Sequence, residues 1–131
     1  MSHAELLQSV HAKDSLEFLA KMIRFRSYSG SPGESELAHF MVGAMKRLGL
    51  DAFPQEVEPG RFNAIGRWRG TGGGRSLLFN GHLDTNPVTE GWTVDPWGGV
   101  HDDRFIYGIG VSNMKAGDAA SPAFMFETPM P

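Results

Sequence analysis

The sequence predicts an α/β fold in which two helices pack on a mixed sheet. Two observations lead to this expectation. Up to Leu48 the apolar residues recur with the helical period of about 3.6 residues, and beyond Gly49 their period shortens to two, as in strands. With 131 residues the chain is long enough for one domain with a single core.

The first helix is predicted over residues 16–25. Leu16, Leu19 and Ile23 are spaced so that they lie on one helical face, which is typical of an amphipathic helix packed on a core. Residues 4–12 also have a helical pattern, so the start of this element is left open.

The second helix is predicted over residues 34–48. Ser31 and Glu34 have the spacing of a capping box, in which each side chain bonds to a free backbone N–H at the start of a helix. Gly49 is the residue type that most readily ends a helix in the left-handed conformation. The helical face expected to be buried consists of Leu37, Phe40, Met41, Met45 and Leu48.

Three strands are predicted after the helices, over residues 53–57, 62–68 and 76–79. The glycine-rich stretch 70–74 is expected to reverse the chain, so that the second and third strands pair antiparallel. The run of apolar residues in the third segment is typical of a strand buried on both faces.

The rest of the chain is expected to be mostly loop. Residues 81–99 are rich in glycine, proline, asparagine and threonine, and long ordered loops of this kind often carry function. A short hairpin is predicted over residues 100–107, and a helix near Lys115. Ser121 and Pro122 are expected to interrupt that helix, because a proline lacks the N–H that an inner helical turn uses.

The composition argues against several classes of protein. The formal net charge is −3 without a block of like charges, so we expect no nucleic-acid or membrane partner and a small-molecule one instead. Cysteine is absent, so any metal ion must be held by histidine, aspartate, glutamate or asparagine. No apolar stretch approaches the ~18 residues that span a bilayer, and the expected location is the cytoplasm.

The strongest local signal is His82 followed two residues later by Asp84, directly after the apolar run. Side chains at the carboxyl end of a strand in an α/β protein face the ligand crevice. A metal-bound histidine normally donates its other ring N–H to a carboxylate, and Asp84 is placed to accept it. A loop histidine beside a turn-forming aspartate fits the same residues, so the pattern alone leaves both interpretations open.

Other candidates have simpler interpretations. The glycine-rich stretch 70–76 lacks the lysine of a phosphate loop, and residues 108–113 lack the third glycine of a dinucleotide site. His101 precedes two acidic residues that favour a hairpin turn over a metal site. Trp92 and Trp97 either line a substrate pocket or pack in the core.

Three stretches carry a resemblance to a known family: LLFNGHLDTNPV at 77–88, GWTVDPWGG at 91–99 and YGIGVSNMKAG at 107–117. In this order they resemble the N-terminal part of the catalytic domain of the M20 metallopeptidase family. That family includes acetylornithine deacetylase, succinyl-diaminopimelate desuccinylase, aminoacylase and glutamate carboxypeptidase. The resemblance implies a partial zinc-peptidase-like α/β sandwich, truncated, that is family-like to about residue 120 of the 131, with a divergent tail at 121–131.

The resemblance also implies roles for three residues. His82 would be a ligand of zinc, and Asp84, the candidate catalytic residue, would hold that histidine and the family's catalytic glutamate. Asn113 stands where the family has an aspartate that bridges two zinc ions. An amide offers one neutral oxygen in place of two charged ones, so we expect one zinc ion or a weak second site.

The activity implied is that of a zinc-dependent amide hydrolase acting on N-acyl amino acids or peptides, in a family whose members are homodimers. The family's catalytic glutamate, its later metal ligands and its dimerisation domain follow the matched stretch. Asp118 and Glu127 are the only acidic residues after Asn113. The alternative is therefore a truncated, catalytically incompetent remnant that binds metal weakly or pairs with another chain.

Overall fold

The computed structural model describes residues 12–126. The predicted helical turn before residue 12 and the tail beyond residue 126 lie outside the described residues. In chain order the elements are the helices α2 (Ala12–Ile23) and α3 (Pro32–Arg47), the strands β1 (Asp51–Glu58), β2 (Arg61–Arg67), β3 (Val100–His101) and β4 (Ile106–Tyr107), the π-helical turn η1 (Val111–Lys115), and the helix α4 (Ala116–Phe126).

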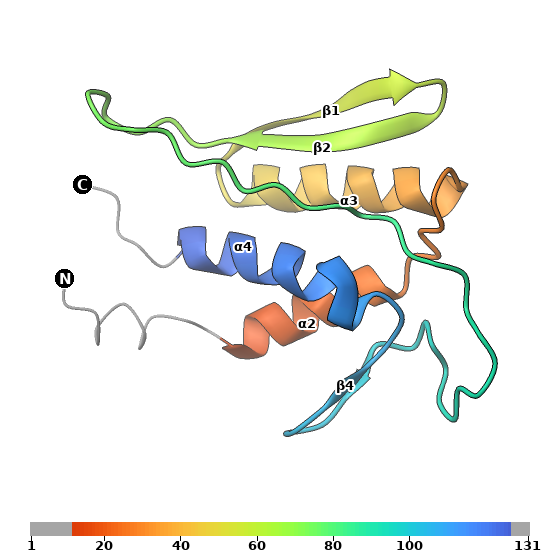
Figure 1. The fold of residues 1–131 in the computed structure, drawn as a ribbon. Helices are drawn as coiled ribbons and strands as arrows, with labels where there is room; N and C mark the ends of the chain where they lie inside the picture. The colour runs from red at the N-terminus through yellow and green to blue at the C-terminus, as the bar shows by residue number, and fades with distance from the viewer. Residues whose placement is uncertain (1–11, 127–131) are drawn as a thin grey trace.

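The elements are arranged in layers around α3 (Figure 1). The antiparallel hairpin of β1 and β2 covers one side of α3, and α4 lies beside α2 on the other side. The strands β3 and β4 form a second antiparallel hairpin next to α2. The mixed α/β class is therefore confirmed, but the single mixed sheet is wrong. The described strands form two separate two-stranded sheets; α3 packs on the β1–β2 sheet, and α2 packs mainly on α4.

The three helices share one hydrophobic core, which fixes α4 and the adjoining η1 against α2. A second, smaller cluster joins α3 to β1 through Val42, Leu50 and Ala52. The buried residues of the larger cluster are Leu19, Met22, Ile23, Leu37, Met41 and Ala119.

The second predicted helix is confirmed as α3, which begins at Pro32, a residue type favoured at the first helical position, two residues before the predicted range. Ser31 is the N-cap residue, but its hydroxyl donates to the carbonyl of Arg26 (3.0 Å) and makes no cap bond. Glu34 accepts a bond from Gly30 N (2.6 Å) and pairs with Arg61 on β2 (3.1 Å), so it ties the start of α3 to the hairpin. The predicted capping box is therefore wrong, because both side chains have partners outside it.

The end of α3 follows the prediction. Gly49 has φ +83°, a left-handed conformation that costs glycine little because it has no Cβ. The chain then enters β1 at Asp51. The predicted buried face of α3 is confirmed in part: Leu37 and Met41 are buried, whereas Phe40, Met45 and Leu48 are half-buried.

The third predicted strand, at residues 76–79, is wrong. The chain there is extended but pairs with no strand of the described part, and Leu77 and Leu78 are 75% and 83% exposed. A strand forms only where a neighbour satisfies its N–H and C=O groups, and an apolar run alone does not supply that neighbour. The stretch 70–74 therefore joins no antiparallel pair.

The predicted interruption of the last helix is also wrong, because α4 continues through Ser121 and Pro122 to Phe126. A proline removes one N–H from the helical bonding pattern, and this single loss is outweighed by packing on α2. Ala119 is buried in the shared core, and the Ser121 hydroxyl donates to the carbonyl of Gly117 (2.9 Å).

The helix predicted near Lys115 is confirmed, and the short hairpin at 100–107 is confirmed as β3 and β4.

Lys115, at the end of η1, is 1% exposed and connects η1 to the end of α2. Its ammonium group donates to the carbonyls of Met22 (3.1 Å) and Phe25 (3.3 Å) and lies 5.7 Å from the centre of the Trp97 ring. Burial lowers the pKa of Lys115 to about 8, against the opposing effect of the Asp118 charge. Lys115 therefore holds two distant parts of the chain together.

We expect Lys115→Ala to lower the free energy of unfolding by about 2 to 4 kcal/mol, since it leaves a cavity and removes two hydrogen bonds. Urea denaturation followed by circular dichroism measures the change. Lys21→Ala on the exposed face of α2 is the matched control, with an expected change within about 0.5 kcal/mol. Equal stability of the two variants would show that the cost of burying the ammonium cancels its contacts.

Phe40→Ala tests the contact between α2 and α3. The Phe40 ring lies 5.4 Å from that of Phe18 and 5.2 Å from that of Phe25, centre to centre. Because Phe40 is only half-buried, we expect a loss of about 2 to 3 kcal/mol, at or below the low end of the range for phenylalanine truncation. Thermal denaturation measures it, with the exposed Phe105→Ala as control; equal shifts in the two variants would contradict the packing role.

Candidate functional site

The segment that carries His82 is fixed to the rest of the chain at Thr85. Thr85 is 4% exposed, its N–H donates to the carbonyl of Ser27 (2.7 Å), and it forms an isolated parallel bridge with Tyr28. The loop between α2 and α3 therefore holds the end of the extended segment. This bridge fixes the chain three residues after His82.

His82 lies between two candidate site residues. Its Nδ1 is 3.0 Å from Asp84 Oδ1, and its Nε2 is 3.1 Å from Asn113 Oδ1. The structure therefore brings together the three residues that the sequence singled out. When Nδ1 donates its proton to Asp84, Nε2 faces the amide oxygen of Asn113 with a lone pair. With the Asn113 amide oxygen facing Nε2, a proton or a cation fits between the two acceptors.

Asn113 is placed by η1, a single π-helical turn of a kind that is frequent at functional sites. The turn begins after Gly110, whose φ of +83° favours glycine. The N–H groups of Asn113 and Lys115 both donate to the carbonyl of Gly110, at 3.2 and 3.1 Å. Asn113 is thus fixed between Gly110 and the buried Lys115.

Asp118 is a fourth polar residue of this region that the sequence analysis did not assign to the site. It lies in the first turn of α4 with its Oδ1 against Gly81, where a Cβ would collide with it. Its Oδ2 is buried and has no hydrogen-bond partner. Burial raises the pKa of Asp118 to about 6, opposed by the charges of His82 and Lys115. The sequence signal that could have identified Asp118 is its position, as an acidic residue in the first turn of the helix that follows Asn113.

The donors at this site fit part of a zinc centre. Two ligands about 2.0–2.1 Å from one tetrahedral zinc ion lie roughly 3.3 Å apart, close to the separation of His82 Nε2 and Asn113 Oδ1. In the described part of the chain, however, no three histidine, cysteine, aspartate or glutamate side chains are grouped to hold a metal ion. The described residues therefore provide one imidazole and one neutral oxygen.

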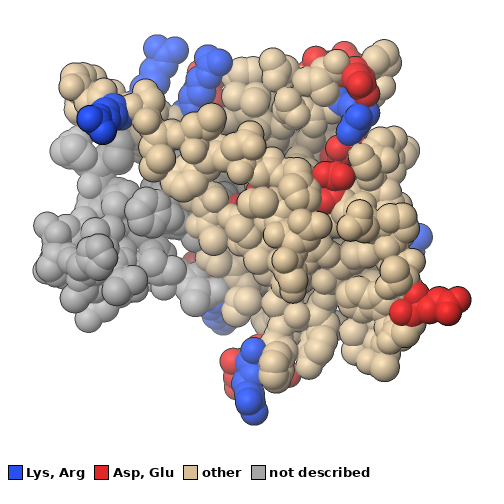
Figure 2. All heavy atoms as spheres, in the orientation of Figure 1, with Lys and Arg blue, Asp and Glu red and all other residues tan. Residues whose placement is uncertain are grey.

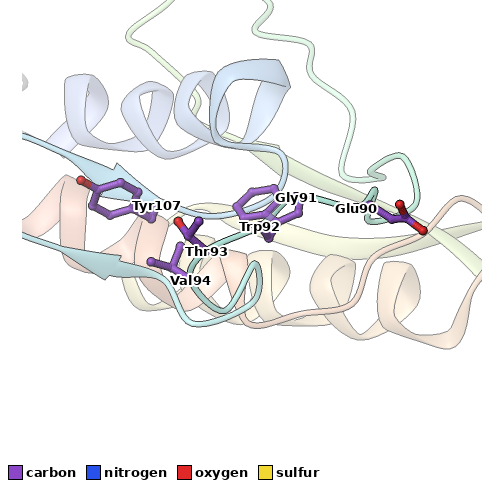
Figure 3. A pocket seen from close by; sticks show the side chains of 6 residues that line it. All are labelled: Glu90, Gly91, Trp92, Thr93, Val94 and Tyr107. Carbon is purple, nitrogen blue, oxygen red and sulfur yellow. The ribbon is translucent and has the colours of Figure 1, made fainter.

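One hollow lies next to this centre, and a second hollow shares the Trp92 side chain with it. One, of about 550 Å³, is lined by Asn113 and by Thr85, Asn86, Trp92 and Ser112, together with part of the 108–110 turn. The other, of about 240 Å³, lies between Trp92 and Tyr107 of β4 (Figure 3). Trp92 lines both hollows, which supports the pocket interpretation for this residue.

Trp97 has a different environment. Its ring makes an edge contact with that of Tyr28, 5.3 Å between centres, and lies near the Lys115 ammonium. It therefore packs around the buried lysine. The hairpin interpretation of His101 is confirmed, since Asp102 accepts bonds from the N–H groups of Arg104 (2.7 Å) and Phe105 (2.8 Å). These bonds hold the pKa of Asp102 below its usual range.

Charge is distributed without a basic patch on the face shown in Figure 2. Lysine and arginine atoms lie at the rim of that face, and uncharged residues cover most of its centre. Among the described residues no helix is long and apolar enough to cross a membrane.

The chain has relatives among curated deacylases. It is 32% identical over 126 residues to "Succinyl-diaminopimelate desuccinylase 2" of Ruegeria sp. (strain TM1040), a match that covers 91% of this chain and 31% of the relative. It is 34% identical over 104 residues to "Aminoacylase-1" of Sus scrofa, with 77% and 26% covered. "Acetylornithine deacetylase" of Vibrio campbellii (strain ATCC BAA-1116) is 38% identical over 89 residues, with 66% and 23% covered.

These relatives define a class, since each is named for the removal of an acyl group or as an acylase. They confirm the resemblance to the M20 family: the chain is homologous to M20 deacylases over part of their length. It spans less than a third of each of the three relatives. No family model matches the chain.

The pH dependence of stability should report on Asp118. Its pKa is about 6 in the folded chain and near 3.9 in an unfolded one, so the folded chain binds more protons between these values. The contribution of Asp118 to stability is therefore greatest below about pH 4 and falls as the pH rises to about 6. Urea denaturation between pH 4 and 7 measures it as the difference between the wild type and Asp118→Asn, which removes the titration but leaves His82 and Lys115. A difference that stays constant over this range would contradict the assignment.

Proposed function

We propose that the chain is the N-terminal portion of the catalytic domain of a zinc-dependent amide hydrolase that acts on N-acyl amino acids or peptides. The observation that carries the proposal is the position of His82 between Asp84 and Asn113. The homology of the chain to deacylases supports the reaction class, because the names of these relatives describe removal of an acyl group from an amino-acid compound.

Each of the three residues has a chemical role in this proposal. His82 holds the zinc ion through Nε2, the ring nitrogen that faces away from Asp84. Asp84 is a positioning residue, because a carboxylate at Nδ1 fixes the tautomer and makes Nε2 a better donor to metal. Asn113 offers its amide oxygen. The ion, when bound, supplies a Lewis acid and a water of lowered pKa.

The substrate is expected in the hollow of about 550 Å³ beside Asn113. The indole of Trp92 provides an apolar wall, and Asn86 and Ser112 provide hydrogen-bonding groups along the lining. An amide-linked acyl group needs this combination of an apolar surface and a few polar groups. The hollow thus lies where a scissile amide can approach a metal ion held at His82.

A second candidate function is metal binding without catalysis, or association with another chain. A catalytic zinc ion needs three protein ligands, an open position and a general base, and the described residues provide only His82 and Asn113 as first ligands. The exposed apolar side chains of Leu77 and Leu78 also provide a surface for pairing.

Zinc titration of the 131-residue chain tests the metal site. We expect weak binding that is lost in His82→Ala, and binding about tenfold tighter in Asn113→Asp, because a carboxylate replaces a neutral oxygen. Neither the chain nor Asn113→Asp should hydrolyse an N-acyl amino acid, since a catalytic zinc ion needs three protein ligands and no three such side chains are grouped among the described residues. Isothermal calorimetry and an amide-hydrolysis assay on the same samples measure both quantities.

His101→Ala is the matched control, because it removes an exposed histidine of the β3–β4 hairpin. Zinc affinity that is equal in His82→Ala and in the control would overturn the metal site. Hydrolysis by the chain that depends on His82 would overturn the non-catalytic alternative and establish the amide-hydrolase activity in this chain.

A further inference from the structure

Asp118 is a carboxylate that the proposed site does not yet use. It lies in α4, a helix that begins directly after the η1 turn carrying Asn113. Its Oδ1 contacts Gly81, the residue before His82, because the missing Cβ of that glycine leaves room for it. The carboxylate therefore occupies the gap between α4 and the His82 segment.

The buried oxygen of the Asp118 carboxylate lacks a hydrogen-bond partner. Oδ2 is buried and accepts no hydrogen bond from any described group. The nearby ammonium of Lys115 is directed to the carbonyls of Met22 and Phe25 instead. A buried carboxylate without such bonds is costly unless a positive charge is close to it. His82 is the other charged or chargeable group that interacts with Asp118.

A divalent cation at His82 and Asn113 would lack an anionic ligand, since it would contact one imidazole and one neutral amide oxygen. Neither of these donors neutralises any of its charge. His82 is about half exposed and Asn113 is exposed, so water weakens the interaction, but a nearby carboxylate still lowers the energy of the bound cation, and the cation in turn compensates the buried Asp118 Oδ2.

We propose that Asp118 supplies the anionic charge that a cation held by His82 and Asn113 requires, in place of an aspartate at position 113. This inference rests on the proposed function, because it needs a cation at His82. It assigns to Asp118 an electrostatic role beside the ion and makes it a positioning residue. In this chain the negative charge of the site is then carried by Asp118 in the first turn of α4, and not by the residue at position 113 in η1.

Zinc titration of the full chain in four forms tests this charge relocation: the wild type, Asp118→Asn, Asn113→Asp and the double variant. Asparagine has the shape of aspartate, so Asp118→Asn keeps the contact with Gly81 and removes the charge. We expect Asp118→Asn to weaken zinc binding about tenfold, the lower end of the loss seen for residues that support metal ligands. The double variant should regain at least the wild-type affinity, because the carboxylate at position 113 restores the charge.

Asp103→Asn is the matched control. It makes the same change of net charge on an exposed residue in the turn of the β3–β4 hairpin, and its zinc affinity should equal that of the wild type. Thermal denaturation without zinc provides the second readout. Asp118→Asn should be at least as stable as the wild type at pH 7, because it removes a charge whose burial outweighs the attraction of His82 and Lys115.

The outcomes separate this inference from the proposed function. Equal zinc affinity of the wild type and Asp118→Asn, with binding still lost in His82→Ala, overturns the role of Asp118 and leaves the metal site in place. A zinc-free Asp118→Asn that is less stable than the wild type, and whose zinc binding Asn113→Asp does not restore, shows a structural role and also overturns it. A wild type that binds no zinc overturns both proposals.

Discussion

The burial of Lys115 is the constraint on which the rest of this structure depends. Its ammonium holds the carbonyls at the end of α2, and the same residue closes the π-helical turn that places Asn113. The loop after α2 in turn holds Thr85, and through it the His82 segment. One side chain thus links both halves of the candidate site to one helix end. The α2–α3–α4 core gives that link a fixed support.

Local structure was largely predictable from the sequence, whereas long-range pairing was not. The helix α3, its glycine ending and the short β3–β4 hairpin follow from periodicity and turn residues, which act over a few positions, whereas the pairing of β1 with β2 was not predicted. The segment at residues 76–79 has the apolar pattern of a buried strand, but that pattern says nothing about which neighbour satisfies its backbone. The continuation of α4 through Pro122 likewise depends on packing against α2, which no local rule contains.

The candidate site shows the same division. The contact of His82 with Asp84 spans two residues and was expected from their spacing. His82 and Asn113 are 31 residues apart in the sequence, and only the family resemblance predicted that they lie together. Composition and periodicity carry no information about a contact between residues so far apart. Asp118 was missed altogether. Its burial depends on the lack of a side chain at Gly81, a packing detail that becomes visible only when both segments are placed.

Gly110 has a wider consequence for this site. A Cβ at this position would lie 2.7 Å from Thr85 Cγ2 and 3.2 Å from Lys115 Cδ, and the φ of +83° disfavours any other residue. Thr85, which holds the His82 segment, and Lys115, which holds the Asn113 turn, therefore pack against each other at Gly110, where only a hydrogen atom fits. Replacement of Gly110 by any larger residue would push Thr85 and Lys115 apart and displace both supports of the site at once. A substitution at His82, Asp84 or Asn113 changes one group of the site, whereas a side chain at Gly110 would move the supports of all three.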